Sequence, residues 1–246
     1  FELGRAGGNM AAFDLKDSSY SEQIRVDLRQ LFFYGCLVTE VALAINLLSS
    51  CYSTFDCTEY WPTLSYLGAF RDHDRLFMFA LTWQAILLCV FYLTAHAHYN
   101  NVLGTQNHRV MLLIGLVTAA ALPWVGYIDE VTPHYLIPTE KIHLILIVGF
   151  STLSILWAWL SLDCMRADWK TQYTGLVKYQ ALAVGLVALS FYQWKYAYTK
   201  AAFTSEALEA VTEWAAVSVA VFAPYMYSKT FLKLRVSLNF RLHSIC

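Results

Sequence analysis

The chain has 246 residues, of which 58% are hydrophobic and only 14% are charged, and its formal net charge is −1. Soluble domains carry about 25% charged residues, so this composition excludes an ordinary soluble domain and predicts an integral membrane protein. The near-neutral balance, without a block of like charge, argues against a nucleic-acid partner, which needs a basic face.

Six apolar segments are long enough to cross a membrane as helices, because about 20 residues at a rise of 1.5 Å span the roughly 30 Å hydrocarbon core. The sequence therefore predicts an all-α polytopic membrane protein, with a six-helix transmembrane domain over 31–228 between tails over 1–30 and 229–246. Ser19 or Ser21 would cap a short surface helix that runs through Arg29 in the first tail. In chain order, the six segments cover residues 31–50, 76–95, 110–128, 142–162, 179–194 and 207–228.

Orientation follows from the distribution of Lys and Arg, which favour the cytosolic side of a membrane. With the N-terminus inside, the inner segments hold 12 of the 17 basic residues and the outer loops hold 5. We therefore expect both termini in the cytosol. The loops that follow the first, third and fifth segments would then face the lumen or the cell exterior.

Ionisable side chains inside the predicted helices indicate a structural or functional role, because inserting each one into the membrane costs at least about 2.5–3.5 kcal/mol of free energy on insertion scales. Glu40 lies near the centre of the first segment, and His143 is one residue inside the outer end of the fourth. Glu206, Glu209 and Glu213 follow i, i+3, i+7 spacing on one face of the sixth. Glu40, His143, Glu209 and Glu213 would enclose a polar pocket open to the outer leaflet, as a lipid-headgroup or proton site. Alternatively, protonated glutamates stabilise the bundle through interhelical hydrogen bonds.

The sequence contains no recognisable catalytic motif and implies neither a cofactor nor a metal. The patterns HExxH, CxxC and GxSxG and a Gly-rich phosphate loop are all missing. His96 and His98 are two residues apart on a predicted helix, so they face different ways. His73, His134 and His143 would have to gather on the outer side to hold a zinc ion, and their spacing does not require it.

Cys51 and Cys57 lie in the predicted first outer loop, seven residues apart counted inclusively. An oxidising lumen would allow a disulfide between them. A membrane that faces a reducing compartment would instead leave two unpaired thiols.

Small residues recur at four-residue steps in three of the predicted helices. Such steps let helices approach closely within the bundle, or let the chain contact a partner protein. The steps are Gly115-x-x-x-Ala119, Ala181-x-x-x-Gly185 and Ala216-x-x-x-Ala220.

Three groups of residues follow one another along the chain in an order that can be compared with known membrane protein families. They are Cys57, Tyr60, Pro62, Leu64, Ser65, Gly68 and Arg75 before the second segment, Ile142 and His143 opening the fourth, and Glu213 and Trp214 in the sixth. In this order they resemble the Frag–DRAM–Sfk superfamily of six-span membrane proteins, nearest the branch of the post-GPI-attachment factor, and the likeness covers nearly the whole chain. The chain departs from that branch at 218–225, where SVAVFAPY stands in place of a polar Asn and His.

The resemblance implies a non-catalytic protein that handles or organises membrane lipids, in GPI-anchor remodelling or a phosphoinositide-related role. It also implies residence in endomembranes (ER, Golgi or lysosome) or in the plasma membrane. The alternative is a structural accessory subunit, held to other membrane protein subunits by helix packing. An intramembrane hydrolase or acyltransferase is the least favoured function, because no catalytic motif supports it.

Overall fold

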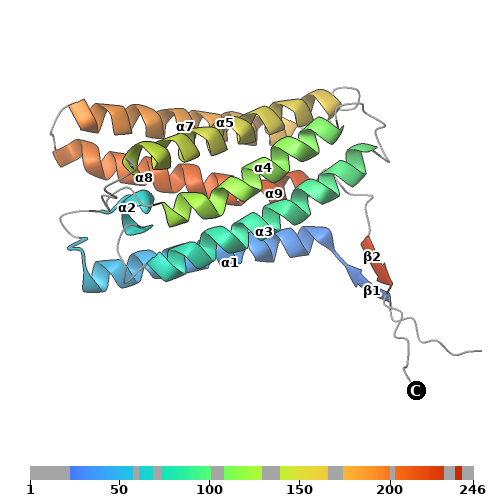
Figure 1. Cartoon of the computed structure of the whole chain (residues 1–246), viewed down its shortest axis with the longest axis horizontal. Helices are drawn as coiled ribbons and strands as arrows, with labels where there is room; N and C mark the ends of the chain where they lie inside the picture. The colour runs from blue at the N-terminus through green and yellow to red at the C-terminus, as the bar shows by residue number, and fades with distance from the viewer. Residues whose placement is uncertain are drawn as a thin grey trace, which may run out of the picture. The chain divides into compact units, whose positions relative to one another are not determined.

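The computed structural model describes most of the chain between residues 23 and 239. The described ranges are 23–57, 61–68, 74–100, 108–128, 139–165, 174–199, 203–229 and 236–239. Contacts between backbone positions divide the chain into two units, a helical bundle within Asp27–Leu234 and a second unit that holds two short strands. Figure 1 labels the helices and the two strands.

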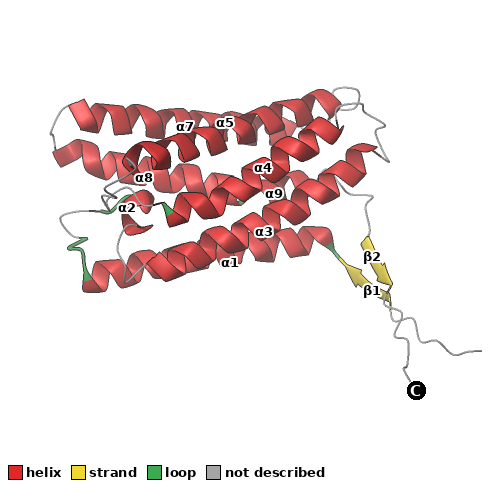
Figure 2. Ribbon diagram, in the orientation of Figure 1, coloured by secondary structure: helices red, strands yellow, loops and turns green. Residues whose placement is uncertain are grey.

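Helices make up all the regular structure that is described in the bundle (Figure 2). Five of the described helices, α1, α3, α4, α5 and α7, are long and apolar enough to cross a membrane. They confirm the first five predicted spans and make this chain a multi-pass membrane protein. The bounds are α1 Leu28–Ser53, α2 Leu64–Gly68, α3 Asp74–His98, α4 His108–Tyr127, α5 Thr139–Met165, α7 Thr174–Thr199, α8 Phe203–Val221 and α9 Ala223–Ser228 (Figure 1).

The start of α1 corrects the expected surface helix in the first tail. Residues Gln23–Val26 form strand β1, and the helix begins only at Leu28. Asp27 caps it, because its carboxylate accepts a hydrogen bond from the backbone N–H of Arg29 at 2.9 Å. The prediction of a surface helix that is capped by Ser19 or Ser21 and runs through Arg29 is therefore wrong.

The second unit contains the two strands of the chain that are described. Strand β1 pairs antiparallel with β2, Val236–Asn239, so that Val26 lies opposite Val236 and Gln23 opposite Asn239. Neither strand is predicted from the sequence of the two tails. Segments from the two ends of the chain thus meet through backbone hydrogen bonds.

The aromatic core of the bundle is built around Phe91 of α3. Its ring meets Phe32 of α1, Trp157 of α5 and Tyr227 of α9 edge-on, with ring centroids 5.7, 5.2 and 5.9 Å apart. Edge-to-face contacts at these distances are favourable for aromatic rings. Helix α3 also packs extensively against both α1 and α4, so it is the central helix of the bundle.

The sixth predicted segment, 207–228, is not one continuous helix. Helix α8 ends at Val221 and α9 begins at Ala223, with Pro224 in its first turn. Proline has no N–H to donate to the carbonyl of Ala220 and its ring blocks the preceding turn, which explains the break. Helix α8 also differs from the five apolar spans because Glu206, Glu209 and Glu213 fall within its 19 residues.

Candidate functional site: a cavity inside the bundle

A cavity of about 550 Å³ lies inside the helical bundle. Helices α3, α4, α5, α7, α8 and α9 and the segment at Thr63 and Leu64 supply its wall. Most of the side chains that line it are apolar or aromatic, among them Leu88, Phe91 and Trp157. A cavity of this size falls within the roughly 300–1,000 Å³ that is typical of small-molecule sites.

His143 of α5 is one of the residues that line the cavity. The side chain is only 4% exposed, and Nδ1 lies 2.5 Å from the carbonyl oxygen of Ile128, just beyond the end of α4. A carbonyl can only accept, so Nδ1 carries the hydrogen of this bond. The other nitrogen, Nε2, is buried and has no hydrogen-bond partner among the described residues.

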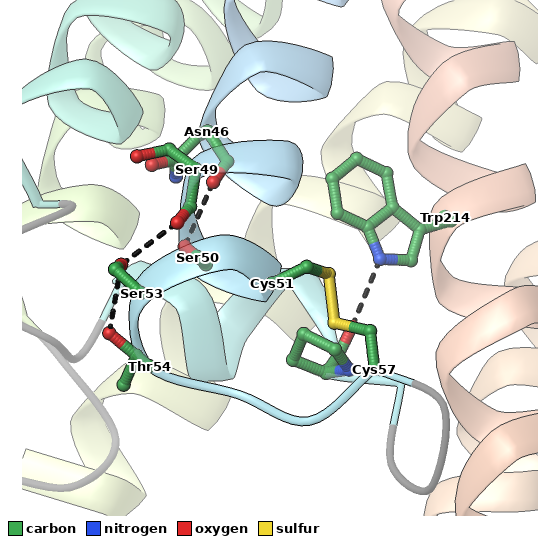
Figure 3. Close-up of a disulfide and its surroundings, with 9 residues drawn as sticks. Asn46, Ser49, Ser50, Cys51, Ser53, Thr54, Cys57 and Trp214 are labelled. Carbon is green, nitrogen blue, oxygen red and sulfur yellow. Dashed lines mark hydrogen bonds between the residues drawn. A yellow bond between two sulfur atoms is a disulfide. The ribbon is translucent and has the colours of Figure 1, made fainter.

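Glu213 of α8 lines the same cavity as His143. The next residue, Trp214, points elsewhere and donates from Nε1 to the carbonyl oxygen of Pro62 at 3.1 Å. This hydrogen bond holds the segment before α2 against α8, and Thr63 within that segment belongs to the cavity wall. Figure 3 shows the contact beside the disulfide.

The disulfide joins Cys51, in the last turn of α1, to Cys57. It closes a small loop immediately before the segment that Trp214 holds (Figure 3). The loop that leads to α2 is therefore restrained twice, by a covalent bond and by an indole hydrogen bond. Both restraints act on backbone next to the cavity wall.

Glu40 lies apart from the cavity, at the contact between α1 and α8. The hydroxyl of Ser218 donates to its Oε2 at 3.3 Å. Its Oε1 is buried and has no partner among the described residues. Of the four residues expected in one pocket, the structure thus brings His143 and Glu213 to one cavity and places Glu40 at another contact. The side chain of Glu209 lies outside the described part of the chain.

Polar side chains that were not predicted as site residues occupy other parts of the cavity wall. Gln180 donates to the hydroxyl of Tyr227 and, at 3.2 Å, to the carbonyl of Ala158. Tyr179 donates to the carbonyl of Val219. These groups satisfy one another or the backbone, unlike Nε2 of His143. An uncharged amide within an apolar segment was the signal that could have found Gln180.

The packing around the cavity is uneven. Helices α5 and α7 are the least buried of the five spans, and they contact each other at few residues. A Cβ added to Gly149 of α5 or Gly185 of α7 would meet no atom within 4 Å. In contrast, a Cβ at Gly115 of α4 would lie 2.4 Å from the ring of Tyr92. The contact between α3 and α4 is therefore tightly packed, and α5 and α7 are packed more loosely.

Within the described part of the chain, no group of three or more His, Cys, Asp or Glu side chains gathers as metal ligands would. His96 instead contacts the backbone oxygen of His108 through Nδ1 at 3.2 Å, and the two rings lie 5.0 Å apart. His73 and His134 lie outside the described residues.

Comparison with known protein families, with curated proteins and with solved structures finds no match for this chain.

Proposed function

We propose that this chain is a non-catalytic membrane protein that binds a membrane lipid in the cavity inside its bundle. The observation that carries the proposal is the cavity itself, whose mainly apolar wall is bounded by the two loosely packed helices α5 and α7. An apolar cavity next to hydrocarbon favours an apolar ligand, because a lipid chain satisfies its wall better than water does. A lipid-handling role is also what the resemblance to the Frag–DRAM–Sfk superfamily implies.

A sixth crossing and cytosolic termini are part of this proposal. Helices α8 and α9 together cover Phe203 to Ser228, and 26 residues at 1.5 Å give about 39 Å, enough to cross the bilayer despite the break. Two carbonyls next to the break, those of Val221 and Val219, accept hydrogen bonds from Gln84 and Tyr179, which suits backbone at membrane depth. Tag accessibility in sealed vesicles tests the topology, and termini on opposite faces would remove the sixth crossing.

The compartment that we propose is an endomembrane or the plasma membrane, with the disulfide on the lumenal or outer side. A bond between Cys51 and Cys57 suits an oxidising environment. The distribution of Lys and Arg along the sequence favours a position of this loop on the side opposite the cytosol.

Lipid that co-purifies with the protein in a mild detergent tests the proposed function. Ala183 of α7 lines the cavity, whereas Ala181 on the same helix is exposed and does not line it. Ala183→Trp should fill the cavity and remove the bound lipid, and Ala181→Trp should leave it in place. Native mass spectrometry and lipid extraction measure both. Retention of lipid by the Ala183→Trp variant would contradict the proposal.

A second candidate function is that of a structural accessory subunit. The observation in its favour is the Ala181-x-x-x-Gly185 step, which the structure leaves exposed on α7 with open space above Gly185. Small residues at this four-residue spacing let another transmembrane helix approach closely. A stoichiometric partner that co-purifies with the wild type and is lost in the Ala181→Trp variant would favour this function. The same pair of variants thus separates lipid binding from partner binding.

A further inference from the structure

We infer that three serines of the cavity wall bind the hydroxyl or ester group of a neutral lipid, such as a diacylglycerol or a sterol, deep inside the membrane. They are Ser151 and Ser154 of α5 and Ser190 of α7, here called the cavity serines. This inference rests on the proposed lipid binding and adds the chemical class of the ligand. It draws on the hydrogen-bonding state of the three hydroxyl groups, the side of each helix on which they lie, and their depth.

The hydroxyl groups of the cavity serines have no hydrogen-bond partner among the described residues. Other hydroxyl groups in the spans bond to their own helix: those of Thr94 and Thr118 donate to the carbonyl oxygen four residues earlier, at 2.7 and 2.8 Å. Each cavity serine is half-buried and its oxygen keeps accessible surface. Polar groups in apolar surroundings normally have a partner. A ligand in the cavity would supply the partner that these hydroxyl groups lack.

Helix geometry places these side chains on the inner side of α5 and α7. Ser154 is nine residues from Ile145, which is exposed and does not line the cavity. Nine residues are about 2.5 turns, so the two side chains lie on opposite sides of α5. Ser190 has the same relation to Ala181, the exposed residue of α7 that does not line the cavity. The cavity serines therefore face away from the surrounding bilayer.

The cavity serines lie at similar depths, near the middle of the membrane. Because α5 and α7 are consecutive spans, they cross in opposite directions, and Gln180 joins them by a bond of 3.2 Å to the carbonyl oxygen of Ala158. Counted outwards from this bond at 1.5 Å per residue, the three serines lie about 6, 11 and 15 Å away. On α5, Ser151 and Ser154 are about 14 and 18 Å from Ile142, where the apolar span of that helix begins. The hydrocarbon core is about 30 Å thick, so both are close to its centre.

Depth determines the class of ligand that these hydroxyl groups can bind. A hydroxyl group both donates and accepts hydrogen bonds, so it suits an alcohol or an ester equally well. A charged side chain at the bilayer centre costs at least about 2.5–3.5 kcal/mol on insertion scales, and a charged lipid head group would be penalised for the same reason. Neutral lipids lack that penalty. A diacylglycerol or a sterol therefore fits the cavity serines better than a phospholipid does.

The test uses photoactivatable lipids and the full-length protein in nanodiscs of phosphatidylcholine. A diacylglycerol and a phosphatidylcholine carry the same diazirine-bearing chain and differ only in the head group, and a diazirine sterol is the third probe. Mass spectrometry locates the labelled peptides. We expect a neutral probe to label the cavity-lining peptides of α5 and α7 about tenfold more than the phosphatidylcholine does, equivalent to about 1.4 kcal/mol. The neutral probe that gives this labelling identifies the source of the hydroxyl or ester group.

Variants of the cavity serines separate ligand recognition from folding. The triple variant Ser151→Ala, Ser154→Ala, Ser190→Ala should lose the tenfold preference. It should change the thermal midpoint by no more than about 2 °C, because the hydroxyl groups have no partner among the described residues. Thr152→Val is the matched control, since it removes a hydroxyl group from an exposed position of α5 that does not line the cavity. This variant should keep the preference.

The possible failures distinguish this inference from the proposed function. No labelling of the cavity wall by any probe would overturn both, and water alone would then be the partner of the hydroxyl groups. Equal or stronger labelling by the phosphatidylcholine would leave lipid binding standing and overturn the neutral class. An undiminished preference in the triple variant would overturn the role of the serines. So would a large loss of thermal stability in that variant, because it would indicate a structural role.

Discussion

The side-chain amide of Gln84, in the middle of α3, donates a hydrogen bond of 3.1 Å to the carbonyl oxygen of Val221, where α8 ends. Its oxygen accepts a second bond, of 2.8 Å, from the hydroxyl of Thr39 in α1. One uncharged side chain thus connects the central helix to two others. It also satisfies a backbone group that the break before Pro224 leaves without its helical partner.

Replacing Gln84 by Leu should destabilise the bundle by about 1–2 kcal/mol, because the Val221 carbonyl and the Thr39 hydroxyl each lose a buried partner. Thermal unfolding of the purified protein in detergent measures the change. Thr94→Val on the same helix is the control, since the Thr94 hydroxyl donates to the carbonyl of Val90 one turn earlier in the same helix. An equal effect of both variants would mean that Gln84 has no special role at the break.

Adding a methyl group at Gly115 should destabilise the protein by about 1–3 kcal/mol, as overpacking of a core does. The new Cβ would lie 2.4 Å from the ring of Tyr92 in α3, which must then shift. Gly185→Ala in α7 is the matched control, because open space surrounds it. That variant should be neutral or stabilising by about 0.4–1 kcal/mol. The same thermal measurement would contradict the packing argument if both changes acted alike.

Replacing both Cys51 and Cys57 by Ser should lower the stability by about 2 kcal/mol, the chain-entropy value for a loop of this size. The two half-cystines are six positions apart in the chain. Cys89→Ser is the control, since Cys89 is a free cysteine. Maleimide labelling of the unreduced wild type should leave Cys51 and Cys57 unmodified. Labelling at both positions without reductant would show that the mature protein carries two thiols there.

Glu40 and Ser218 should show a coupling of about 0.6 kcal/mol in a double-mutant cycle, the average for hydrogen bonds between membrane helices. Their contact joins α1 to α8 at 3.3 Å, away from the cavity. The cycle uses Glu40→Leu and Ser218→Ala, with thermal unfolding as the readout. Because Glu40 does not line the cavity, neither variant should change the amount of co-purified lipid. Lipid loss in Glu40→Leu without loss of stability would instead assign Glu40 to the ligand site.

Much of the membrane architecture could be predicted from the sequence, because insertion depends on local length and hydrophobicity. The first predicted segment, 31–50, lies within α1, and the segment 76–95 lies within α3. The same local logic failed at the sixth segment. The apolar composition of that segment predicts one continuous helix across Pro224, whereas α8 ends at Val221 in the structure.

The candidate site could be predicted only in part. The cost of burying ionisable groups singled out His143 and Glu213, which share the cavity, but also Glu40, which does not. Periodicity indicates which face of a helix a residue lies on, and it does not indicate which helix that face meets.

The sequence by itself determined that this chain is a multi-pass helical membrane protein, because hydrophobic length is a local property. Only the tertiary structure decided that Gln84 meets Val221, 137 positions away. It also decided that α5 and α7 pack loosely enough to leave a cavity beside His143. The physical reason is that side-chain volumes and interhelical hydrogen bonds select helix neighbours, and these interactions join residues that are distant in sequence.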